Sequence, residues 1–390
     1  MIPSYPLHPA SIAYLKKGHP WVTRDRFSAK FDPHKEFVIG TGKRDDERFL
    51  LINDPKHPQV VARLWRPSVG SEPYFKFLDE LTMRLDASLS KREEWNCRKK
   101  RDNFYLVFGE GDFIPGLFIQ KLSDIIIIQS YCDFWEPHKD FLIKYLDQKF
   151  PNHFYYWQDR TKDQKIKMQN INSAPSEKII QEFQLKYQLR FGDHYDFGIY
   201  TDMSAIREIV APFFANTQKM ANLYSYTGAY SLYALSKGAK IVHSVDLSSK
   251  YLDWLDQNLA LNPQIEISKH QRFDMSVDQF LKEAEMYDLI LTDPPSASSD
   301  GQKINKAFDT YPNQIWAMYK KLLPGGRIIA FLNTHAVSRV KFITMIKKTI
   351  TQQQLKLKIE LELGLKEDCP RLKGFTEGDY LKGVVLKKGK

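Results

Sequence analysis

Short apolar runs separated by turn residues fill the first 65 residues of the chain. The β-prone runs lie at 37–39, 49–52 and 60–64, with glycines and the polar turn 53–55 between them. Several short strands broken by turn residues are typical of a small all-β unit. The pattern therefore predicts a small β-barrel in this part of the chain.

A helical pattern follows this region. Apolar side chains recur every three or four residues, the spacing that places them on one face of a helix. They are Tyr74, Leu78, Leu81, Leu85 and Leu89. We therefore expect a connecting helix over residues 73–95, which ends in a cluster of charged residues.

The next pattern mixes strands and helices. Apolar runs at 104–108 and 125–129 predict strands, and the spacing over 138–150 predicts a helix. A polar stretch, 161–178, interrupts this unit. From residue 184 onward strand and helix patterns alternate, which is the arrangement of a doubly wound α/β domain.

Candidate chemistry begins at residues 222–229, which read Asn-Leu-Tyr-Ser-Tyr-Thr-Gly-Ala. This pattern predicts a strand that turns into a helix, and the first turn of a helix leaves backbone N–H groups free for a ligand. Gly228 is the one glycine in the turn. Because the fully glycine-rich dinucleotide fingerprint is missing, a cofactor with a pyrophosphate is disfavoured.

An acid ends the next predicted strand. Asp246 follows the apolar run 241–245 and lies eighteen residues after Gly228. A carboxylate at this position can accept hydrogen bonds from both ribose hydroxyls of a cofactor that contains a nucleoside. The alternative role of Asp246 is that of N-cap for the predicted helix 248–261.

Two further acids occupy comparable positions. Asp274 follows a candidate third strand, where a carboxylate can accept from an adenine amino group, although acids are also common at surfaces. Asp293, with Pro294 and Pro295, follows the apolar strand 287–292. The prolines enforce an extended, rigid turn at the strand's carboxyl end, where open α/β sheets bind ligands, and an ordinary loop is the alternative.

Composition limits the class of protein. Lys and Arg number 57 against 47 Asp and Glu, a net charge of +10 that favours a polyanionic partner. No apolar run approaches the roughly 20 residues of a membrane span, and residues 1–9 lack the pattern of a secretory signal, so we expect a cytoplasmic protein. Cys97, Cys132 and Cys369 are too dispersed for a zinc site or a disulfide framework.

With these residues in place, nearly the whole chain resembles the bacterial large-subunit rRNA methyltransferase I family. That family has an N-terminal PUA domain, a central α+β domain and a C-terminal methyltransferase domain. The matching segments are 18–22 (Gly-His-Pro-Trp-Val), 109–117 (Gly-Glu-Gly-Asp-Phe-Ile-Pro-Gly-Leu), 222–228, Asp246, 293–295 and 377–383 (Glu-Gly-Asp-Tyr-Leu-Lys-Gly).

The resemblance implies an α/β fold, a Rossmann-like class I methyltransferase with a seven-stranded sheet, and four segments. These are a PUA-like RNA-binding β-barrel (1–72), a connecting helix and basic linker (73–102), a central α+β domain (103–190) and the methyltransferase domain (191–390). It also implies S-adenosylmethionine as cofactor, large-subunit (23S) rRNA as substrate, and a homodimer, because members of that family commonly dimerise.

The same resemblance implies the site residues. The expected cofactor contacts are Asp202, Arg207, Asn222, Tyr224, Ser225, Tyr226, Thr227, Gly228, Asp246, Leu247, Asp274, Met275 and Asp293. The expected catalytic residues are Asp293, Pro294 and Pro295, which would frame a base turned out of its stack, together with Asn333.

Asn333 departs from the resembled family. Its members make 5-methylcytosine with a cysteine in a Phe-Ser-Cys-Ser segment, and residues 331–334 here read Phe-Leu-Asn-Thr. Cytosine C5 needs a thiolate that adds to C6, which Asn333 cannot supply. Cys369 is a candidate relocated thiol, although a buried, incidental cysteine is the more common case.

A ring nitrogen such as guanine N7 carries its own lone pair and needs only correct positioning. The related family that makes 7-methylguanine in large-subunit rRNA resembles this chain at 195–196, Gly198, Asp202, 307–309 and Asn333. Upstream, both families carry an Asp-Gln-Arg-like or Asp-His-Arg-like run, where this chain has Asp202-Met203-Ser204 and keeps Arg207.

Two surface features are candidates for RNA contact. The basic residues 91–92 and 98–101 could bind phosphates, or could form a solvated linker. The aromatic run 154–157 could stack on unpaired bases, or could be a buried strand. Two functional alternatives also stay open: a nicotinamide-dependent oxidoreductase, and an RNA-binding protein that has kept the fold without catalysis.

Overall fold

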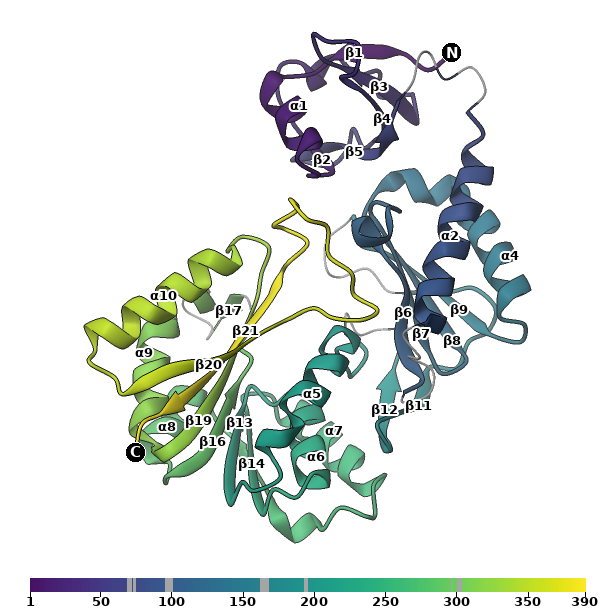
Figure 1. The fold of residues 1–390 in the computed structure, drawn as a ribbon. Coiled ribbons are helices and arrows are strands. Elements are labelled where there is room, and N and C mark those ends of the chain that lie inside the picture. Colours follow the sequence, from purple (N-terminus) through teal and green to yellow (C-terminus); the bar gives the residue numbers. More distant parts are fainter. Residues whose placement is uncertain are drawn as a thin grey trace. The chain divides into compact units, whose positions relative to one another are not determined.

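The computed structural model describes residues 1–68, 72, 75–94, 101–161, 168–192, 196–295, 297–299 and 304–390. Packing divides the chain into two compact bodies, each drawn in Figure 1. The N-terminal body comprises Met1–Lys178, Arg190–Phe197 and Glu367–Gly378. The C-terminal body comprises Ile179–Leu189, Gly198–Lys366 and Asp379–Lys390. Each body is therefore built from segments that are not contiguous in the sequence.

The first sheet of the N-terminal body contains the three predicted strands, which are confirmed. Its order is β1-β3-β4-β5-β2, with β1 (Ser4–Pro6), β2 (Trp21–Thr23), β3 (Phe37–Thr41), β4 (Arg48–Asn53) and β5 (Val60–Pro67). Val38, Leu51 and Val61 form its core with Ile12 and Leu15 of α1 (Pro9–Lys16). The strands curl around this core in Figure 1. The PUA-like assignment stays a prediction.

The connecting helix is confirmed with different bounds. Helix α2 spans Phe77–Glu94, and residues 73, 74 and 95 of the predicted span lie outside the described part of the chain. Leu81 and Leu85 are buried as predicted, but Leu78 is 42% exposed. Phe77 takes its place in the core because its ring packs against Phe134 at 5.2 Å.

The second sheet of the N-terminal body confirms the predicted strands and the helix α4 (Lys139–Lys149). Its order is β10-β9-β8-β7-β6, with β6 (Asn103–Phe108), β7 (Leu117–Leu122), β8 (Ile125–Ser130), β9 (Phe154–Asp159) and β10 (Gln169–Asn170). In β9, Tyr155, Tyr156 and Trp157 are at most 3% exposed. The hypothesis that these aromatic rings stack on RNA bases is therefore wrong, because they belong to the core.

The segment Glu367–Gly378 belongs to the N-terminal body although it lies near the end of the chain. Its Asp368 carboxylate accepts from the Arg101 guanidinium at 2.6 Å, and its backbone carbonyl accepts from Arg92 at 2.8 Å. Arg92 also donates two hydrogen bonds to the Asp112 carboxylate, at 2.7 and 2.6 Å. These four side chains are at most 3% exposed, so they form a buried ionic network.

This network corrects the interpretation of the basic cluster. Arg92 and Arg101 were candidate phosphate ligands, but burial against carboxylates makes them part of the interior. Lys91 keeps 39% of its side chain exposed and lies 3.6 Å from Asp112. Residues 98–100 of the cluster lie outside the described chain.

The C-terminal body is built on one seven-stranded sheet of order β15-β14-β13-β16-β19-β21-β20. Its strands are β13 (Lys219–Leu223), β14 (Ile241–Asp246), β15 (His270–Asp274), β16 (Tyr287–Thr292), β19 (Leu322–Asn333), β20 (Leu357–Gly364) and β21 (Leu381–Lys388). The five from β15 to β19 are parallel, and β21 runs antiparallel to β19 and β20. The α/β prediction is therefore confirmed.

Helices cover both faces of this sheet (Figure 1). One face carries α8 (Val277–Glu283), α9 (Ala307–Lys320) and α10 (Arg339–Gln352), whose apolar residues share a core with the strands. The other carries α5 (Ser204–Val210), α6 (Ala229–Ser236) and α7 (Ser249–Ala260). The hairpin of β11 (Glu177–Glu182) and β12 (Leu185–Arg190) precedes them in sequence.

The strand order reverses between β13 and β16. From β13 the chain adds β14 and β15 on one side, and from β16 it adds β19 on the other. In open α/β sheets a ligand binds at the carboxyl ends of the strands at such a reversal, because the two connecting loops diverge there. The loop after β13 and Asp293 after β16 flank this point, so the fold places the candidate site here.

Candidate cofactor and methyl-transfer site

The loop between β13 and α6 has an unusual backbone. Tyr224 has a φ of +58°, Tyr226 of +49° and Gly228 of +85°. Left-handed backbone is easy for glycine, but it is rare for a bulky residue and costs free energy. Such outliers cluster at ligand-binding loops, where the surrounding structure enforces them. Gly228 lies in the turn between β13 and α6, as predicted, and it is the N-cap of α6.

Asp246 lies at the end of β14, where the sequence placed it. Its carboxylate accepts from the backbone N–H groups of Tyr226 and Ser248, each at 2.9 Å. The N-cap of α7 is Ser248, whose hydroxyl accepts from Tyr251, so the capping alternative for Asp246 is wrong. A carboxylate has four lone-pair sites, so it can still accept from a ribose hydroxyl beside these backbone groups. Burial raises its pKa.

Asp274 lies beside Asp246 at the end of the adjacent strand. The two residues are partners in the parallel register of β14 and β15, and the Met275 N–H donates to the Asp246 carbonyl at 3.2 Å. Asp274 is exposed, and the Leu247 side chain keeps 65% of its surface. An exposed leucine next to two acids suits the apolar face and the polar edge of an adenine ring.

Buried hydroxyl groups without a partner mark the same edge of the sheet. Ser225 Oγ follows β13 and Thr292 Oγ1 ends β16, and neither forms a hydrogen bond within the described structure. A buried polar group without a partner costs free energy, so each such group calls for an explanation. A nucleoside-containing cofactor at the reversal of the strand order would supply hydrogen-bond partners for these two hydroxyls. The residues present therefore fit such a cofactor.

Asp293 occupies the other side of the reversal. It is half-buried, Pro294 is buried and Pro295 is exposed. Desolvation by burial and the nearby Asp202 carboxylate raise the pKa of Asp293 to about 7, although the Arg207 guanidinium opposes this. Asp202 is 8% exposed and accepts from the Tyr380 hydroxyl at 2.7 Å. The structure therefore brings together two acids that lie 91 residues apart in sequence (293 minus 202).

Three of the predicted cofactor ligands, Arg207, Asn222 and Thr227, form hydrogen bonds with protein groups. Arg207 donates to the Glu182 carboxylate at 2.6 and 2.9 Å, and both are at most 1% exposed. The Asn222 amide donates to Ser231 at 2.8 Å inside the sheet-helix layer. Thr227 is also buried and donates to the Gly198 carbonyl. Their direct contact with the cofactor stays a prediction, and their observed contacts shape the loop.

Asn333 ends β19 and pairs in register with Leu381 of β21. The next residue, Thr334, donates its N–H to the Tyr380 carbonyl at 2.9 Å. The Lys382 ammonium is buried and donates to the carbonyls of Thr334, Val337 and Asp379. The 377–383 motif therefore fixes the backbone that follows Asn333.

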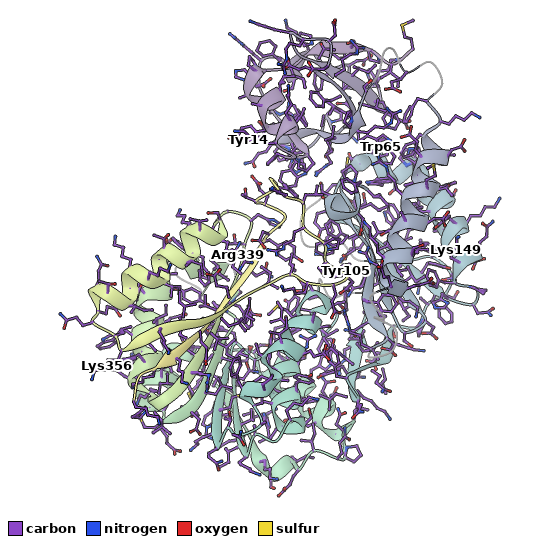
Figure 2. All side chains as sticks on the ribbon, viewed as in Figure 1. Tyr14, Trp65, Tyr105, Lys149, Arg339 and Lys356 are labelled. Carbon is purple, nitrogen blue, oxygen red and sulfur yellow. The ribbon has the colours of Figure 1, made fainter. Side chains whose placement is uncertain are left out.

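Arg339, labelled in Figure 2, strengthens this arrangement. It holds the Asp379 carboxylate with two hydrogen bonds, at 2.8 and 3.0 Å. Burial lowers the pKa of Lys382 to about 8, because the ammonium has lost water. Sequence reasoning found the motif but missed the roles of Tyr380, Lys382 and Glu182, since their partners lie far away in the chain.

Tyr230 is another residue that the sequence did not single out. It lies in α6, is 7% exposed and stacks on Phe331 with ring centroids 5.7 Å apart. Its hydroxyl has no hydrogen-bond partner in the described structure. Burial raises the pKa of this phenol well above its ordinary value, and the charges of Arg207, Asp293, Glu182 and Asp202 also act on it.

Metal ligation, membrane spanning and thiol chemistry can be checked against the described residues. No group of three or more His, Cys, Asp or Glu side chains could hold a metal ion there. Every described helix is too short or too polar to cross a membrane. Cys132 and Cys369 are both buried within segments of the N-terminal body, and Cys97 lies outside the described chain.

Comparisons with known proteins agree with this geometry. Residues 158–357 match the family model of S-adenosylmethionine-dependent methyltransferases. The ribosomal RNA large subunit methyltransferase I of Pseudoalteromonas atlantica is 25% identical over 406 residues, which cover 98% of each chain. The same-named protein of Erwinia tasmaniensis is 26% identical, with 96% of each chain covered.

Solved structures match almost the entire chain. The methyltransferase SMU.776, crystallised with S-adenosylhomocysteine, superposes with a TM-score of 0.88 at 22% identity, over 99% of this chain and 100% of that one. A methyltransferase structure from Streptococcus mutans gives a TM-score of 0.86 at 22% identity, with the same coverage. Both segments of chemistry predicted from the sequence, around Asp246 and around Asp293, fall inside the part that the family model covers.

Proposed function

Because this chain belongs to the S-adenosylmethionine-dependent methyltransferase family, we propose that it transfers a methyl group to a base of large-subunit ribosomal RNA. The substrate class rests on relatives named ribosomal RNA large subunit methyltransferase I, which match over nearly the full chain. The net charge of +10 suits a polyanionic substrate. The nicotinamide alternative does not fit this family.

The cofactor supplies a methyl group on a positively charged sulfur, and the residues of this chain position it. Asp246 would accept from the ribose hydroxyls, while Leu247 and Asp274 would contact the adenine. The strained loop 224–228 would approach the remainder of the cofactor with its backbone. The support is that Ser225 and Thr292 keep buried hydroxyls without partners at this edge.

We propose a ring nitrogen of guanine, N7, as the target atom. Asn333 stands at the position where the cytosine-modifying relatives carry a cysteine, and an amide cannot add to C6 of cytosine. Cys369, the candidate relocated thiol, is 1% exposed, which fits the more common case of a buried, incidental cysteine. Guanine N7 attacks with its own lone pair and loses no proton, so the site needs to align the base without a nucleophile.

Asp293, Pro294 and Pro295 would frame this base opposite the cofactor. The rigid turn limits where a flat ring can lie, and the stacked pair of Tyr230 and Phe331 lies beside the acid pair. Enforced alignment of the two reactants is by itself a large contribution to catalysis. The observation that carries the proposal is the meeting of Asp293 and Asp202 at the reversal of the strand order.

A labelling experiment tests the proposal. The protein is incubated with isotopically labelled S-adenosylmethionine and with ribosomal RNA from cells that lack large-subunit modifications, and the RNA is digested to nucleosides. We expect label in 7-methylguanosine from the large-subunit RNA. Label in 5-methylcytidine would contradict the target atom, and RNA binding without any label would support the non-catalytic alternative.

A further inference from the structure

A row of positively charged side chains crosses three neighbouring strands of the C-terminal body. Arg327 in β19 pairs in register with Lys387 in β21, and Lys387 pairs with Lys358 in β20. Residues directly opposite each other in antiparallel strands point to the same face of the sheet. The three cations therefore lie next to one another, at about 5 Å from strand to strand.

The row lies on the face of the sheet that points away from α8, α9 and α10. Ile328 and Leu386, which follow and precede two of the cations in their strands, belong to the core shared with those helices. Successive side chains of a strand point to opposite faces, so Arg327 and Lys387 point away from that core. The Arg327 guanidinium lies over the Phe213 ring instead, 5.0 Å from its centroid.

Lys356 extends the row along β20. It directly precedes the strand, is exposed and is labelled in Figure 2. Its backbone carbonyl accepts from the Gly389 N–H at 2.8 Å, so the pairing of the two chain segments continues to this residue. Lys358 follows two positions later and is also exposed, and the period of a strand places both lysines on one face. These four cations form the basic row: Arg327, Lys356, Lys358 and Lys387.

Glu360 is the carboxylate that pairs with the basic row. It accepts two hydrogen bonds from Arg327, at 2.6 and 3.1 Å. These hydrogen bonds lower the pKa of Glu360, and the charges of Lys387 and Lys358 act in the same direction, so the acid is ionised. Within the described residues, Lys356, Lys358 and Lys387 form no ion pair of their own. The four cations therefore exceed their carboxylate, and the row keeps a net positive charge.

Such a row opposes folding, because like charges directly opposite each other in a sheet are destabilising. Lysines on an edge strand also prevent it from pairing with other chains, which is an alternative reason for Lys356 and Lys358 in β20. This reason does not apply to Lys387, because β21 lies between β19 and β20 inside the sheet. Lys387 has a cation opposite it on each side, so a bound anion would relieve the repulsion.

We propose that the basic row is a docking site for the phosphate backbone of the RNA substrate. The inference rests on the proposed function, from which it takes the substrate class. Lysine and arginine neutralise phosphates without reading the base sequence. Across three strands the row is about 10 Å long, enough to reach more than one phosphate. It therefore contributes affinity and orientation, and the choice of nucleotide is left to the methyl-transfer site.

The basic row is separate from the cofactor pocket. Arg327 pairs with Leu289 near the amino end of β16, whereas Asn333, six residues later, ends β19. Six residues of a strand span about 20 Å, so the row lies toward the edge of the sheet opposite the methyl-transfer site. An RNA that contacts both places must extend well beyond its target nucleotide. We therefore expect the row to govern how tightly a long RNA binds.

The salt dependence of RNA binding tests the proposal. Filter binding of the full chain to large-subunit ribosomal RNA is measured between about 0.05 and 0.2 M salt. On logarithmic axes the affinity falls with a slope of about 0.7 per neutralised phosphate on single strands and about 0.9 on duplexes. The double variant Lys358→Gln with Lys387→Gln should bind several-fold more weakly, and its slope should be smaller by about 1.4 to 1.8.

Two further double variants serve as controls. Lys240→Gln with Lys282→Gln removes the same charge at exposed positions before β14 and in α8, so the slope should stay that of the wild type. Lys358→Arg with Lys387→Arg keeps the charge and should also keep the slope. Circular dichroism and thermal melting verify folding, and the Lys358→Gln, Lys387→Gln protein should melt no lower than the wild type because repulsion is relieved.

The possible outcomes separate this inference from the proposed function. A wild-type slope in the Lys358→Gln, Lys387→Gln protein would overturn the docking site and leave the RNA substrate standing. The same loss of slope in the Lys240→Gln, Lys282→Gln control would also overturn it, because total charge alone would then account for the effect. A wild-type protein that binds no RNA would contradict the proposed function and the docking site together.

Discussion

The candidate site has two ends, one around Asp246 and one around Asp293, and the two acids have different surroundings. Asp246 accepts two backbone hydrogen bonds at 2.9 Å, which hold its carboxylate in one orientation. The pKa of Asp293 is raised instead, first by burial and then by the Asp202 carboxylate. The first end is organised before any ligand arrives, whereas the second stores unfavourable electrostatic energy that a ligand can relieve.

The largest expected effect is a loss of folding stability at the buried Arg207–Glu182 ion pair, whose arginine also lowers the pKa of Asp293. Glu182→Ala leaves Arg207 buried without its carboxylate, and breaking a buried ion pair in this way typically costs about 3 to 5 kcal/mol. Urea unfolding of the variant should show this loss. Replacing both residues, with Glu182→Met and Arg207→Met, is the control, because a neutral pair should recover much of the stability. A loss below about 1 kcal/mol for Glu182→Ala would show that water reaches Arg207.

The next effect should appear in catalysis. Asp293→Asn keeps the shape of the side chain and removes its charge, and removal of one electrostatic group from an active site typically costs about a hundredfold in rate. Single-turnover methyl transfer to RNA measures this loss. Asp274→Asn at the exposed adenine edge is the matched control, and its rate should change less than about threefold. Equal losses of rate in the two variants would show that Asp293 contributes no more to methyl transfer than Asp274 does.

At the first end the expected effect is on binding. Asp246→Asn replaces charge-assisted hydrogen bonds to the ribose, which are worth about 1.5 to 3 kcal/mol, so the dissociation constant should rise about tenfold to a hundredfold. Because the ribose is common to donor and product, both ligands should weaken by the same factor. Calorimetry provides the two constants. A selective loss of affinity for the donor would mean that Asp246 acts on more of the cofactor than its ribose.

The smallest effect concerns stability and pH. The pKa of Asp293 is raised to about 7 from an ordinary value of 3.8, so the folded state binds this proton more tightly than the unfolded state. The stabilisation is present at low pH and is lost as the pH rises from about 4 to about 7. Asp293→Asn should therefore raise the melting temperature more at pH 8 than at pH 5. An equal shift at both pH values would contradict the raised pKa.

Local sequence patterns predicted the first end better than the second. The positions of Asp246 and Asp293 followed from apolar strands that end in an acid, because parallel strands present their carboxyl ends at one edge. The Asp202–Tyr380 hydrogen bond spans 178 residues, and no periodicity can reveal such a pair. The strained backbone at Tyr224 was also invisible, since tyrosine does not signal a left-handed conformation as glycine does.

For the basic cluster, the sequence predicted exposed side chains that the structure buries. Charge alone placed Arg92 and Arg101 on a surface for phosphate, but the acids that bury them are Asp112 and Asp368. Asp368 lies 267 residues beyond Arg101, in a segment that sequence reasoning assigned to the methyltransferase domain. A run of like charges therefore predicts exposure only where no distant acid can reach it.

The return of residues Glu367–Gly378 to the N-terminal body has a consequence for synthesis on the ribosome. Translation makes Arg92 and Arg101 long before it makes Asp368, so the early chain cannot complete the ionic network that buries them. The N-terminal body cannot complete this network until residues Glu367–Gly378 have been synthesised. A ribosome that stalls before codon 368 would release a chain that lacks both this segment and strand β21 of the C-terminal body, so both bodies depend on the same late stretch of synthesis.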